Sequence, residues 1–288
     1  MLLTDPAFIK RLESLYLLAR KILGGTLQAD RKSTRKGSGI TFADYSEYSF
    51  GDDYRAIDWR VFARLDTLMI KLFELEEDVT IYILLDASQS MLNKFQYAQQ
   101  LVAALAYIAL HSMDKVVIFG MAEDLVSITK PTLGRGKTLS VLQTLEAAES
   151  FGVDTDFTAA TRRFCQWHKK RGMVITVSDF LFPKGYEEGL NFLHWHHHDL
   201  FCIQVQDNHD RECHLKGDVE LKCIESGKTQ KLTITHTEAR AYEQAVMDWN
   251  EQLKHFCGAR GIGLVSTTTD VPFDQIIQTL LKRGGLVS

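Results

Sequence analysis

The sequence is poor in proline and has no long apolar run. Only 4 prolines occur in 288 residues, which excludes a Pro-rich linker or stalk. No stretch of about 18 uncharged apolar residues is present, and the first residues do not combine a basic segment with an apolar signal core. We therefore expect a cytoplasmic protein without stable membrane insertion.

Cysteine and net charge are limited as well. The 5 cysteines are odd in number and form no C-x-x-C pair, so neither a disulfide framework nor a thiolate zinc site is indicated. The 33 basic and 37 acidic residues give a net charge of -4. This removes the strongest electrostatic reason to expect DNA or RNA as a partner.

Residues 1–78 differ from the rest of the chain in their pattern of apolar and polar residues. Apolar positions recur at helical spacing over residues 5–23 and stop at two glycines. The basic stretch 31–39 is interpreted as a solvated loop, with binding of phosphate or of an acidic partner as the alternative. Residues 40–48 and 67–75 have the pattern of strands. We predict an N-terminal helix followed by a small β subdomain.

Residues 79–288 alternate between short apolar runs and helical segments. Continuous runs of this kind are typical of strands that are buried on both faces, and the alternation predicts an α/β fold with a mainly parallel sheet and helices on both sides. A hairpin near 217–235 is expected as an insertion in this domain. The predicted strands are 79–85, 116–121, 174–177, 200–205 and 262–265, and the predicted helices are 94–113, 137–150, 157–170, 186–197 and 238–256.

The first of these strands ends in a cluster of side-chain oxygens. Asp86 follows the apolar run, and Ser88 and Ser90 come at alternate positions before the next helix. The carboxyl ends of parallel strands line the ligand crevice of an open sheet, so we expect these oxygens to converge there. Such a set suits Mg²⁺, although three ligands from one turn are too few.

Two further loops could complete the ligand set. Another buried strand ends at Ser178 and Asp179, and Thr155 lies between two acids before a predicted helix. If these loops meet at one edge of the sheet, hydroxyls of Ser88, Ser90 and Thr155 would join the carboxylates of Asp86 and Asp179. Thr158 is an alternative to Thr155.

These motifs resemble known families. The D-x-S-x-S pattern, with Thr155 and Asp179 downstream, resembles the metal-ion-dependent adhesion site (MIDAS) of von Willebrand factor type A domains. The segment Gly51–Arg64 resembles the signature of the bacterial family called domain of unknown function 58. Members of that family are typically found beside MoxR-type AAA+ ATPases, and the resemblance extends from about Leu12 to the C-terminus.

The resemblance implies a function as well as a fold. It implies a von Willebrand factor A-like (Rossmann-like) domain that binds proteins and is not an enzyme. A magnesium ion on Asp86, Ser88, Ser90, Thr155 and Asp179 would accept an acidic residue of a partner. The partner would be a MoxR-type AAA+ ATPase or its client protein.

Other interpretations remain open at this point. D-x-S-x-S can be a helix N-cap, or Asp86 can be the nucleophile of a Mg²⁺-dependent phosphoryl-transfer enzyme, as in haloacid-dehalogenase-like phosphatases. Such phosphatases generally have a second acid where Ser88 stands, which argues against the enzyme.

The charged residues of the Gly51–Arg64 segment also allow two interpretations. An internal salt-bridge lattice that ties the β subdomain to the sheet is the first prediction for them, because buried charges must be paired. A partner-contact surface is the alternative. The residues concerned are Arg55, Asp58, Arg60 and Arg64.

Overall fold

The structure is a computed structural model of the chain, and its contacts divide it into two compact units. The larger contains residues 1–19 and 79–286, and the smaller contains residues 20–78 together with the last two residues of the chain. Each unit is described by itself. The residues that the structure describes are 2–23, 32–36, 41–76, 80–149, 156–213, 215, 217–222 and 229–282.

A mainly parallel sheet forms the centre of the larger unit, as the sequence predicts. Its strands in the described residues are β4 (Thr80–Asp86), β5 (Lys115–Met121), β6 (Leu125–Ser127), β7 (Thr132–Leu133), β8 (Met173–Ser178), β9 (Asp199–Gln206) and β12 (Gly263–Thr268). They run in the order β12-β9-β8-β4-β5-β6, with β7 also paired to β5. Neighbours from β12 to β5 are parallel, whereas β6 and β7 are antiparallel to β5.

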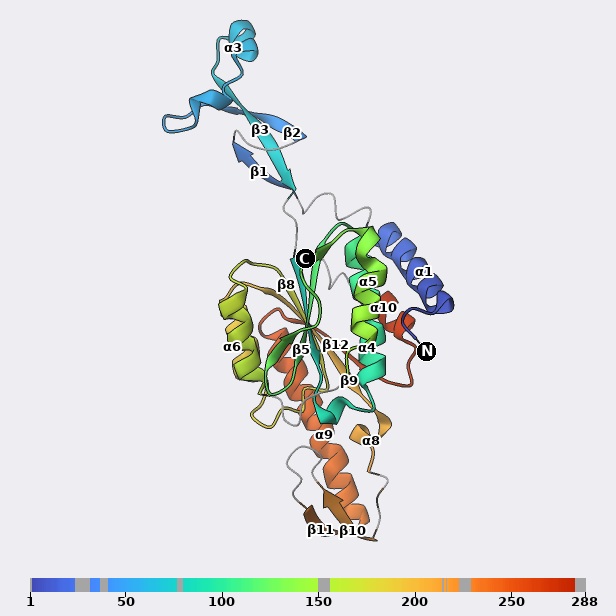
Figure 1. The fold of residues 1–288 in the computed structure, drawn as a ribbon. Helices are drawn as coiled ribbons and strands as arrows, with labels where there is room; N and C mark the ends of the chain where they lie inside the picture. The colour runs from blue at the N-terminus through green and yellow to red at the C-terminus, as the bar shows by residue number, and fades with distance from the viewer. Residues whose placement is uncertain are drawn as a thin grey trace. The chain divides into compact units, whose positions relative to one another are not determined.

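Helices cover both faces of this sheet (Figure 1). One face carries α6 (Phe157–Trp167), α7 (Glu187–Trp195) and α9 (His236–Gly258), and the other carries α4 (Phe95–His111), α5 (Thr138–Glu146), α10 (Phe273–Lys282) and α1 (Pro6–Leu23). The central strands are buried on both sides, which explains their continuous apolar sequences. The α/β fold and the helices predicted in this unit are confirmed, with ends shifted by a few residues.

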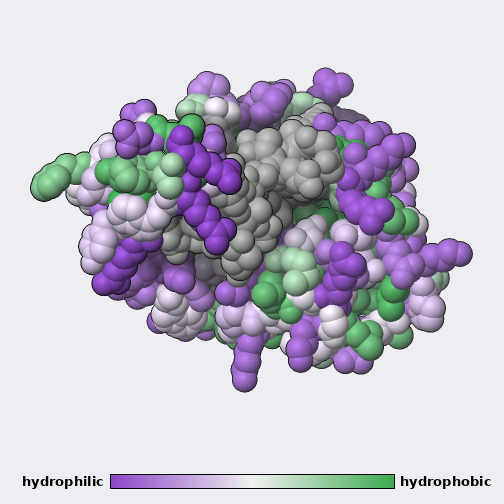
Figure 2. Space-filling model, turned by 90° about the horizontal axis from the view of Figure 1, so that it is seen from above, coloured by the Kyte–Doolittle hydropathy of each residue, from purple (hydrophilic) through white to green (hydrophobic). Residues whose placement is uncertain are grey.

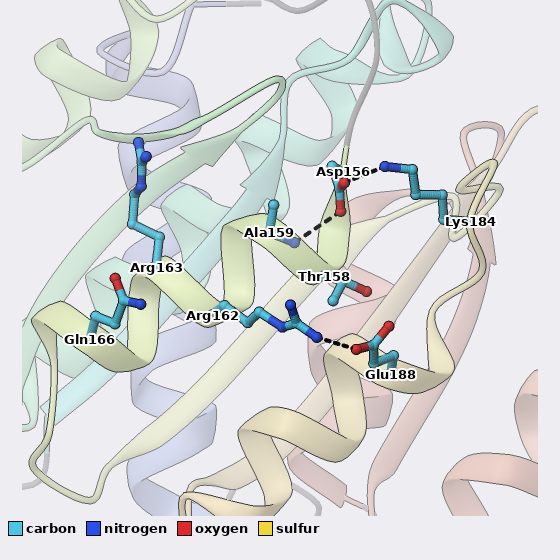
Figure 3. Close-up of a pocket in the computed structure, with 8 residues that line it drawn as sticks. All are labelled: Asp156, Thr158, Ala159, Arg162, Arg163, Gln166, Lys184 and Glu188. Atoms are coloured by element: carbon cyan, nitrogen blue, oxygen red, sulfur yellow. Dashed lines mark hydrogen bonds and ion pairs between the residues drawn. The ribbon is translucent and has the colours of Figure 1, made fainter.

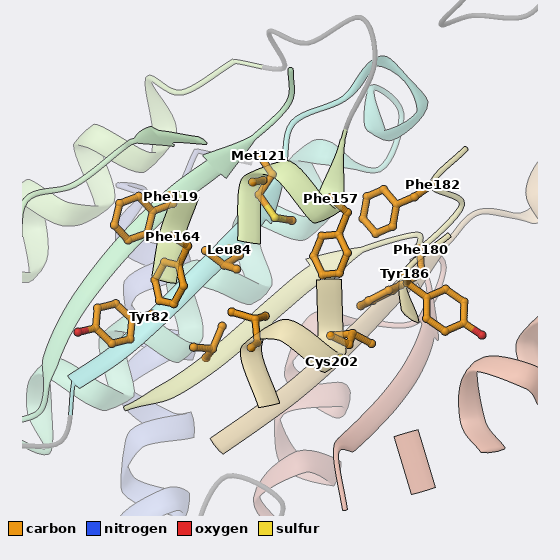
Figure 4. Packing of buried hydrophobic residues seen from close by; sticks show 14 of the residues in the cluster. Tyr82, Leu84, Phe119, Met121, Phe157, Phe164, Phe180, Phe182, Tyr186 and Cys202 are labelled. Atoms are coloured by element: carbon orange, nitrogen blue, oxygen red, sulfur yellow. The ribbon is translucent and has the colours of Figure 1, made fainter. Parts of the chain in front are cut away.

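Aromatic side chains fill the space between the sheet and helices α6 and α7 (Figure 4). The ring of Phe164, from α6, lies 5.0 Å from that of Tyr82 on β4 and 5.8 Å from that of Phe119 on β5, both edge to face. All three side chains are at most 4% exposed. This cluster anchors α6 to the sheet.

The N-terminal helix belongs to the larger unit by its contacts. Phe8 is fully buried and its ring lies 5.1 Å from that of Phe273 on α10. Arg11 pairs with Asp274 at 2.5 Å. From the sequence we predict that this helix belongs to a domain of residues 1–78. In the structure its apolar face is covered by α10, which comes from the other end of the chain.

The smaller unit contains a three-stranded antiparallel sheet in its described part. Its strands are β1 (Lys32–Lys36), β2 (Thr41–Glu47) and β3 (Met69–Glu76), in the order β1-β3-β2. The strands predicted at 40–48 and 67–75 are confirmed. The loop predicted over 31–39 is wrong for Lys32–Lys36, because the second edge of β3 offers these residues a complete ladder of hydrogen bonds.

The hairpin predicted near 217–235 is also present. β10 (Gly217–Lys222) and β11 (Thr229–Ile234) pair antiparallel just before α9.

Hydrophilic side chains dominate the described surface on the face that Figure 2 shows, where hydrophobic ones form small scattered groups. Of the helices in the described ranges, none is long and apolar enough to cross a membrane.

Loss of the Phe164 ring should destabilise the larger unit. We expect Phe164→Ala to lower the free energy of unfolding by about 3 to 5 kcal/mol, because it removes buried area and leaves a cavity. Trp167→Ala on the same helix, where the side chain is 53% exposed, should change it by less than about 1 kcal/mol. Urea denaturation of both variants tests this, and equal losses would contradict the packing described for α6.

Candidate metal centre at the ends of strands β4 and β8

The sheet has a topological switch point at the carboxyl end of β4. After β4 the chain continues to β5 on one side, and β8, β9 and β12 then add on the other side. At such a point the two connecting loops diverge and leave a crevice between adjacent strands. Asp86 ends β4, Ser178 ends β8 and Asp179 directly follows it, so the predicted ligands at these two strands lie at this crevice.

Asp86 is buried, and both of its carboxylate oxygens accept hydrogen bonds. Its Oδ2 accepts from the Ser178 hydroxyl at 2.5 Å, and its Oδ1 accepts from the backbone N–H of Ser88 at 3.0 Å. Only 1% of the residue is exposed. Burial, followed by the negative charge of Asp179, raises the pKa of Asp86 to about 6.

The two serines of the D-x-S-x-S motif lie on the turn after β4. The hydroxyl oxygens of Ser88 and Ser90 are 2.9 Å apart, Ser88 is buried and Ser90 is half-buried. A short 3-10 helix, Gln89–Met91, follows Ser88. The spacing of two residues therefore places both hydroxyls on one side of the turn.

Asp179 forms an ion pair that the sequence did not reveal. Its Oδ2 accepts from Lys94 Nζ at 2.7 Å, and the same ammonium donates to Asp210 Oδ2 at 2.8 Å. Lys94 and Asp179 are each 1% exposed. Burial tends to lower the pKa of Lys94, but the attraction of Asp179 and Asp210 outweighs it and raises the pKa above its ordinary value, so Lys94 is an ammonium ion.

One signal could have identified this lysine. Lys94 directly precedes α4, in which no side chain is an acid, lysine or arginine. An isolated basic residue at the start of a buried apolar helix needs a counter-charge nearby. Its second partner, Asp210, lies in the short helix α8 (Asn208–Arg211) and could not be paired with it from spacing alone.

The third predicted loop is only partly described. Thr155 lies outside the described residues. Thr158 lies in the first turn of α6 and lines a surface pocket with Asp156 and Lys184, which form an ion pair at 2.6 Å (Figure 3). Among the described residues no hydrogen bond joins Thr158 to Asp86, Ser88 or Asp179.

The candidate ligand atoms at the crevice are of the type that binds a hard divalent cation. They are carboxylate and hydroxyl oxygens, the ligands that Mg²⁺ prefers. No group of three or more His, Cys, Asp and Glu side chains that could hold a metal occurs among the described residues, so the candidate site combines two carboxylates with hydroxyls. The positive charge beside them in the structure is the Lys94 ammonium.

The Gly51–Arg64 segment forms the end of the smaller unit. Asp58 is buried, caps α3 (Trp59–Leu65), pairs with Lys71 at 3.1 Å and accepts from the Tyr45 hydroxyl at 3.0 Å. The arginines are exposed and have no ion pair in the described part of the chain. Of the salt-bridge lattice predicted for Arg55, Asp58, Arg60 and Arg64, the described residues therefore show only the pair of Asp58 with Lys71, because the three arginines lie at solvent-exposed positions.

Comparison with known proteins decides the family. Residues 44–252 match the family model described as Protein of unknown function DUF58. The chain belongs to the DUF58 family. The uncharacterized protein Rv1480 of Mycobacterium tuberculosis is 24% identical to this DUF58 protein in an alignment of 275 positions that covers 92% of this chain and 86% of that protein.

Solved structures similar to this DUF58 protein include a conserved hypothetical protein BatB and a von Willebrand factor type A protein. BatB from Bacteroides thetaiotaomicron is 14% identical with a TM-score of 0.44, covering 73% of this chain and 100% of that one. The von Willebrand factor type A protein from Catenulispora acidiphila is 7% identical with a TM-score of 0.40, covering 88% of this chain and 49% of that one.

Stability without metal should depend on the ionisation of Asp86. The pKa of Asp86 is raised on folding. Its contribution to the free energy of unfolding is therefore fully present below the ordinary pKa of Asp and is lost as the pH rises through about 6. In metal-free buffer, the free energy of unfolding of Asp86→Asn minus that of the wild type should therefore increase from pH 4 to pH 7, by up to about 3 kcal/mol. Urea denaturation across this range measures the difference, and a constant difference would contradict the assigned pKa.

Proposed function

We propose that this DUF58 protein is a metal-dependent protein-interaction module. In this proposal Mg²⁺ binds to Asp86, Ser88, Ser90, Thr155 and Asp179 and takes an acidic residue of a partner as a further ligand. The observation that carries the proposal is the burial of Asp86 and Asp179 at one switch point, next to two hydroxyls that lie 2.9 Å apart.

The mixture of ligands suits binding better than hydrolysis. A bound Mg²⁺ would supply a strongly electrophilic centre, because hydroxyl ligands leave more of its charge uncompensated than carboxylates would. The protein's own side chains fix the geometry: Ser178 and the Ser88 N–H hold both oxygens of Asp86. Ser88 also stands where a phosphatase of the haloacid-dehalogenase type generally has its second acid, so the chain offers no such acid for a leaving group.

The proposed partner is a MoxR-type AAA+ ATPase or the client that it remodels. Membership in the DUF58 family supports this partner class through the resemblance described above. The partner would supply an exposed Asp or Glu to the metal, and the DUF58 protein would act as its accessory or adaptor.

A second contact with the same partner is proposed at the Gly51–Arg64 segment. Tyr54 and Trp59 are 63% and 61% exposed, and the guanidinium of Arg55 lies 5.9 Å from the centre of the Tyr54 ring. Exposed Tyr, Trp and Arg are the residues that contribute most to protein interfaces. The exposed positive charges of Arg55, Arg60 and Arg64 favour an acidic surface on the partner.

Removal of Asp86 should abolish the metal-dependent interaction. We expect Asp86→Ala, or EDTA with the wild type, to weaken binding of the purified MoxR-type ATPase by at least about tenfold, while circular dichroism shows an intact fold. Asp199→Ala is a matched control, since Asp199 starts β9 and is half-buried. Pull-down with and without Mg²⁺ measures the effect.

Two outcomes would contradict this function. Full-affinity binding in EDTA would exclude the metal-centred interaction. Turnover of a phosphate monoester that requires Mg²⁺ and is lost in Asp86→Asn would instead support the phosphoryl-transfer alternative.

The second contact predicts a loss that does not depend on metal. Simultaneous Arg55→Ala, Arg60→Ala and Arg64→Ala substitutions should weaken binding of the ATPase both with Mg²⁺ and in EDTA. They should leave the melting temperature unchanged, since none of the three arginines forms an ion pair with the residues that the structure describes. Unchanged affinity in isothermal titration would exclude this surface from the interface.

A further inference from the structure

Lys94 is the cation that the structure places among the acids of the candidate site. A buried ammonium costs several kcal/mol unless it is paired and hydrogen-bonded, and Lys94 has two carboxylate partners, at 2.7 and 2.8 Å. The residue is 1% exposed. Its positive charge therefore stabilises a pair of acids that would otherwise repel each other.

Both oxygens of Asp179 already accept a hydrogen bond. Oδ1 accepts from the backbone N–H of Leu181 at 3.0 Å, and Oδ2 accepts from Lys94. The Leu181 donor is fixed by the backbone, whereas the Lys94 ammonium is at the end of a four-carbon chain with rotatable bonds. A metal that binds Asp179 directly would compete first with Lys94 for Oδ2.

Asp210 can retain the Lys94 ammonium when Asp179 binds a metal. Asp210 is held in a capping box, in which its Oδ2 accepts from the backbone N–H of Asp207 at 3.0 Å. Its carbonyl oxygen accepts from the Tyr242 hydroxyl at 3.0 Å. Asp210 is therefore positioned independently of Lys94 and can retain it when Asp179 is released.

We propose that Lys94 is an internal competitor of the metal: it neutralises Asp179 when no metal is bound, and it moves to Asp210 alone when metal binds. This inference rests on the proposed function and specifies how the same site is regulated. The exchange keeps a positive charge beside Asp179 in both states, so the site remains folded without metal and binds Mg²⁺ more weakly than its oxygen ligands alone would.

Substitution of Lys94 tests the competition directly with Mg²⁺ as the only ligand. Lys94→Met keeps the length of the side chain and removes the charge. We expect Lys94→Met to lower the Kd for Mg²⁺ by at least about tenfold in isothermal titration. The metal-free variant should melt at a lower temperature than the wild type, because its buried acids lose their counter-charge, and saturating Mg²⁺ should restore most of the loss.

Lys71→Met is the matched control. Lys71 also pairs with a buried aspartate, Asp58, at 3.1 Å, but it belongs to the smaller unit. This variant removes the same charge from the protein and should leave the Kd for Mg²⁺ unchanged. An equal gain in affinity would mean that net charge, rather than the position of Lys94, determines metal binding.

Asp210→Asn gives a second test that does not require the Lys94 variant to fold. Without Asp210 the released ammonium has no carboxylate to retain it, so we expect weaker Mg²⁺ binding than in the wild type. In a double-mutant cycle, Asp210→Asn should have little effect on the Kd once Lys94 is Met, because Asp210 acts through Lys94. An equal effect in both backgrounds would contradict the exchange.

The outcomes separate this inference from the proposed function. Mg²⁺ binding by the wild type with no gain in Lys94→Met would overturn the competition and leave the metal site intact. Absence of Mg²⁺ binding in the wild type and in Lys94→Met would overturn the metal site itself. Binding only in Lys94→Met would support the competition and show that it dominates in the isolated protein.

Discussion

The site depends on the burial of two carboxylates at one edge of the sheet. Asp86 and Asp179 are each 1% exposed, and the charge of Asp179 contributes to the raised pKa of Asp86. Two acids in this position repel each other unless a cation lies near them. In the structure Lys94 is the counter-charge of Asp179; in the proposed complex a divalent metal would bind both acids, with Lys94 retained on Asp210. The proposed metal binding and its regulation both follow from this single electrostatic constraint.

The larger unit supplies the rigidity that such a constraint requires. Asp86 ends β4 and Asp179 directly follows β8, and both strands are buried apart from their first residues, so the two side chains cannot move apart without disturbing the sheet. α4 fixes Lys94, and the capping box fixes Asp210. The smaller unit has a different character: it buries Asp58 beside Lys71 and exposes arginine and aromatic side chains, as expected for a surface that contacts a partner.

The parallel strands of the larger unit could be predicted from the sequence because their apolar runs are continuous, and the helices between them because apolar positions recur at helical spacing. Asp86, Ser88 and Asp179 could be located at one edge because parallel strands end together. The ion pair of Lys94 could not be predicted, because its partners lie 85 and 116 residues away and no local spacing links them. The strand Lys32–Lys36 was missed because its pairing with β3, and not its composition, determines its conformation.

In this proposal, one cation site at the ends of β4 and β8 is shared between a metal and Lys94. A crystal structure of the full chain grown with Mn²⁺ tests it most directly, since anomalous scattering identifies the ion. The account predicts Mn²⁺ at the oxygens of Asp86, Ser88, Ser90 and Asp179, with the Lys94 ammonium on Asp210 alone. A structure without Mn²⁺ at these oxygens, in which Lys94 still bridges Asp179 and Asp210, would contradict it.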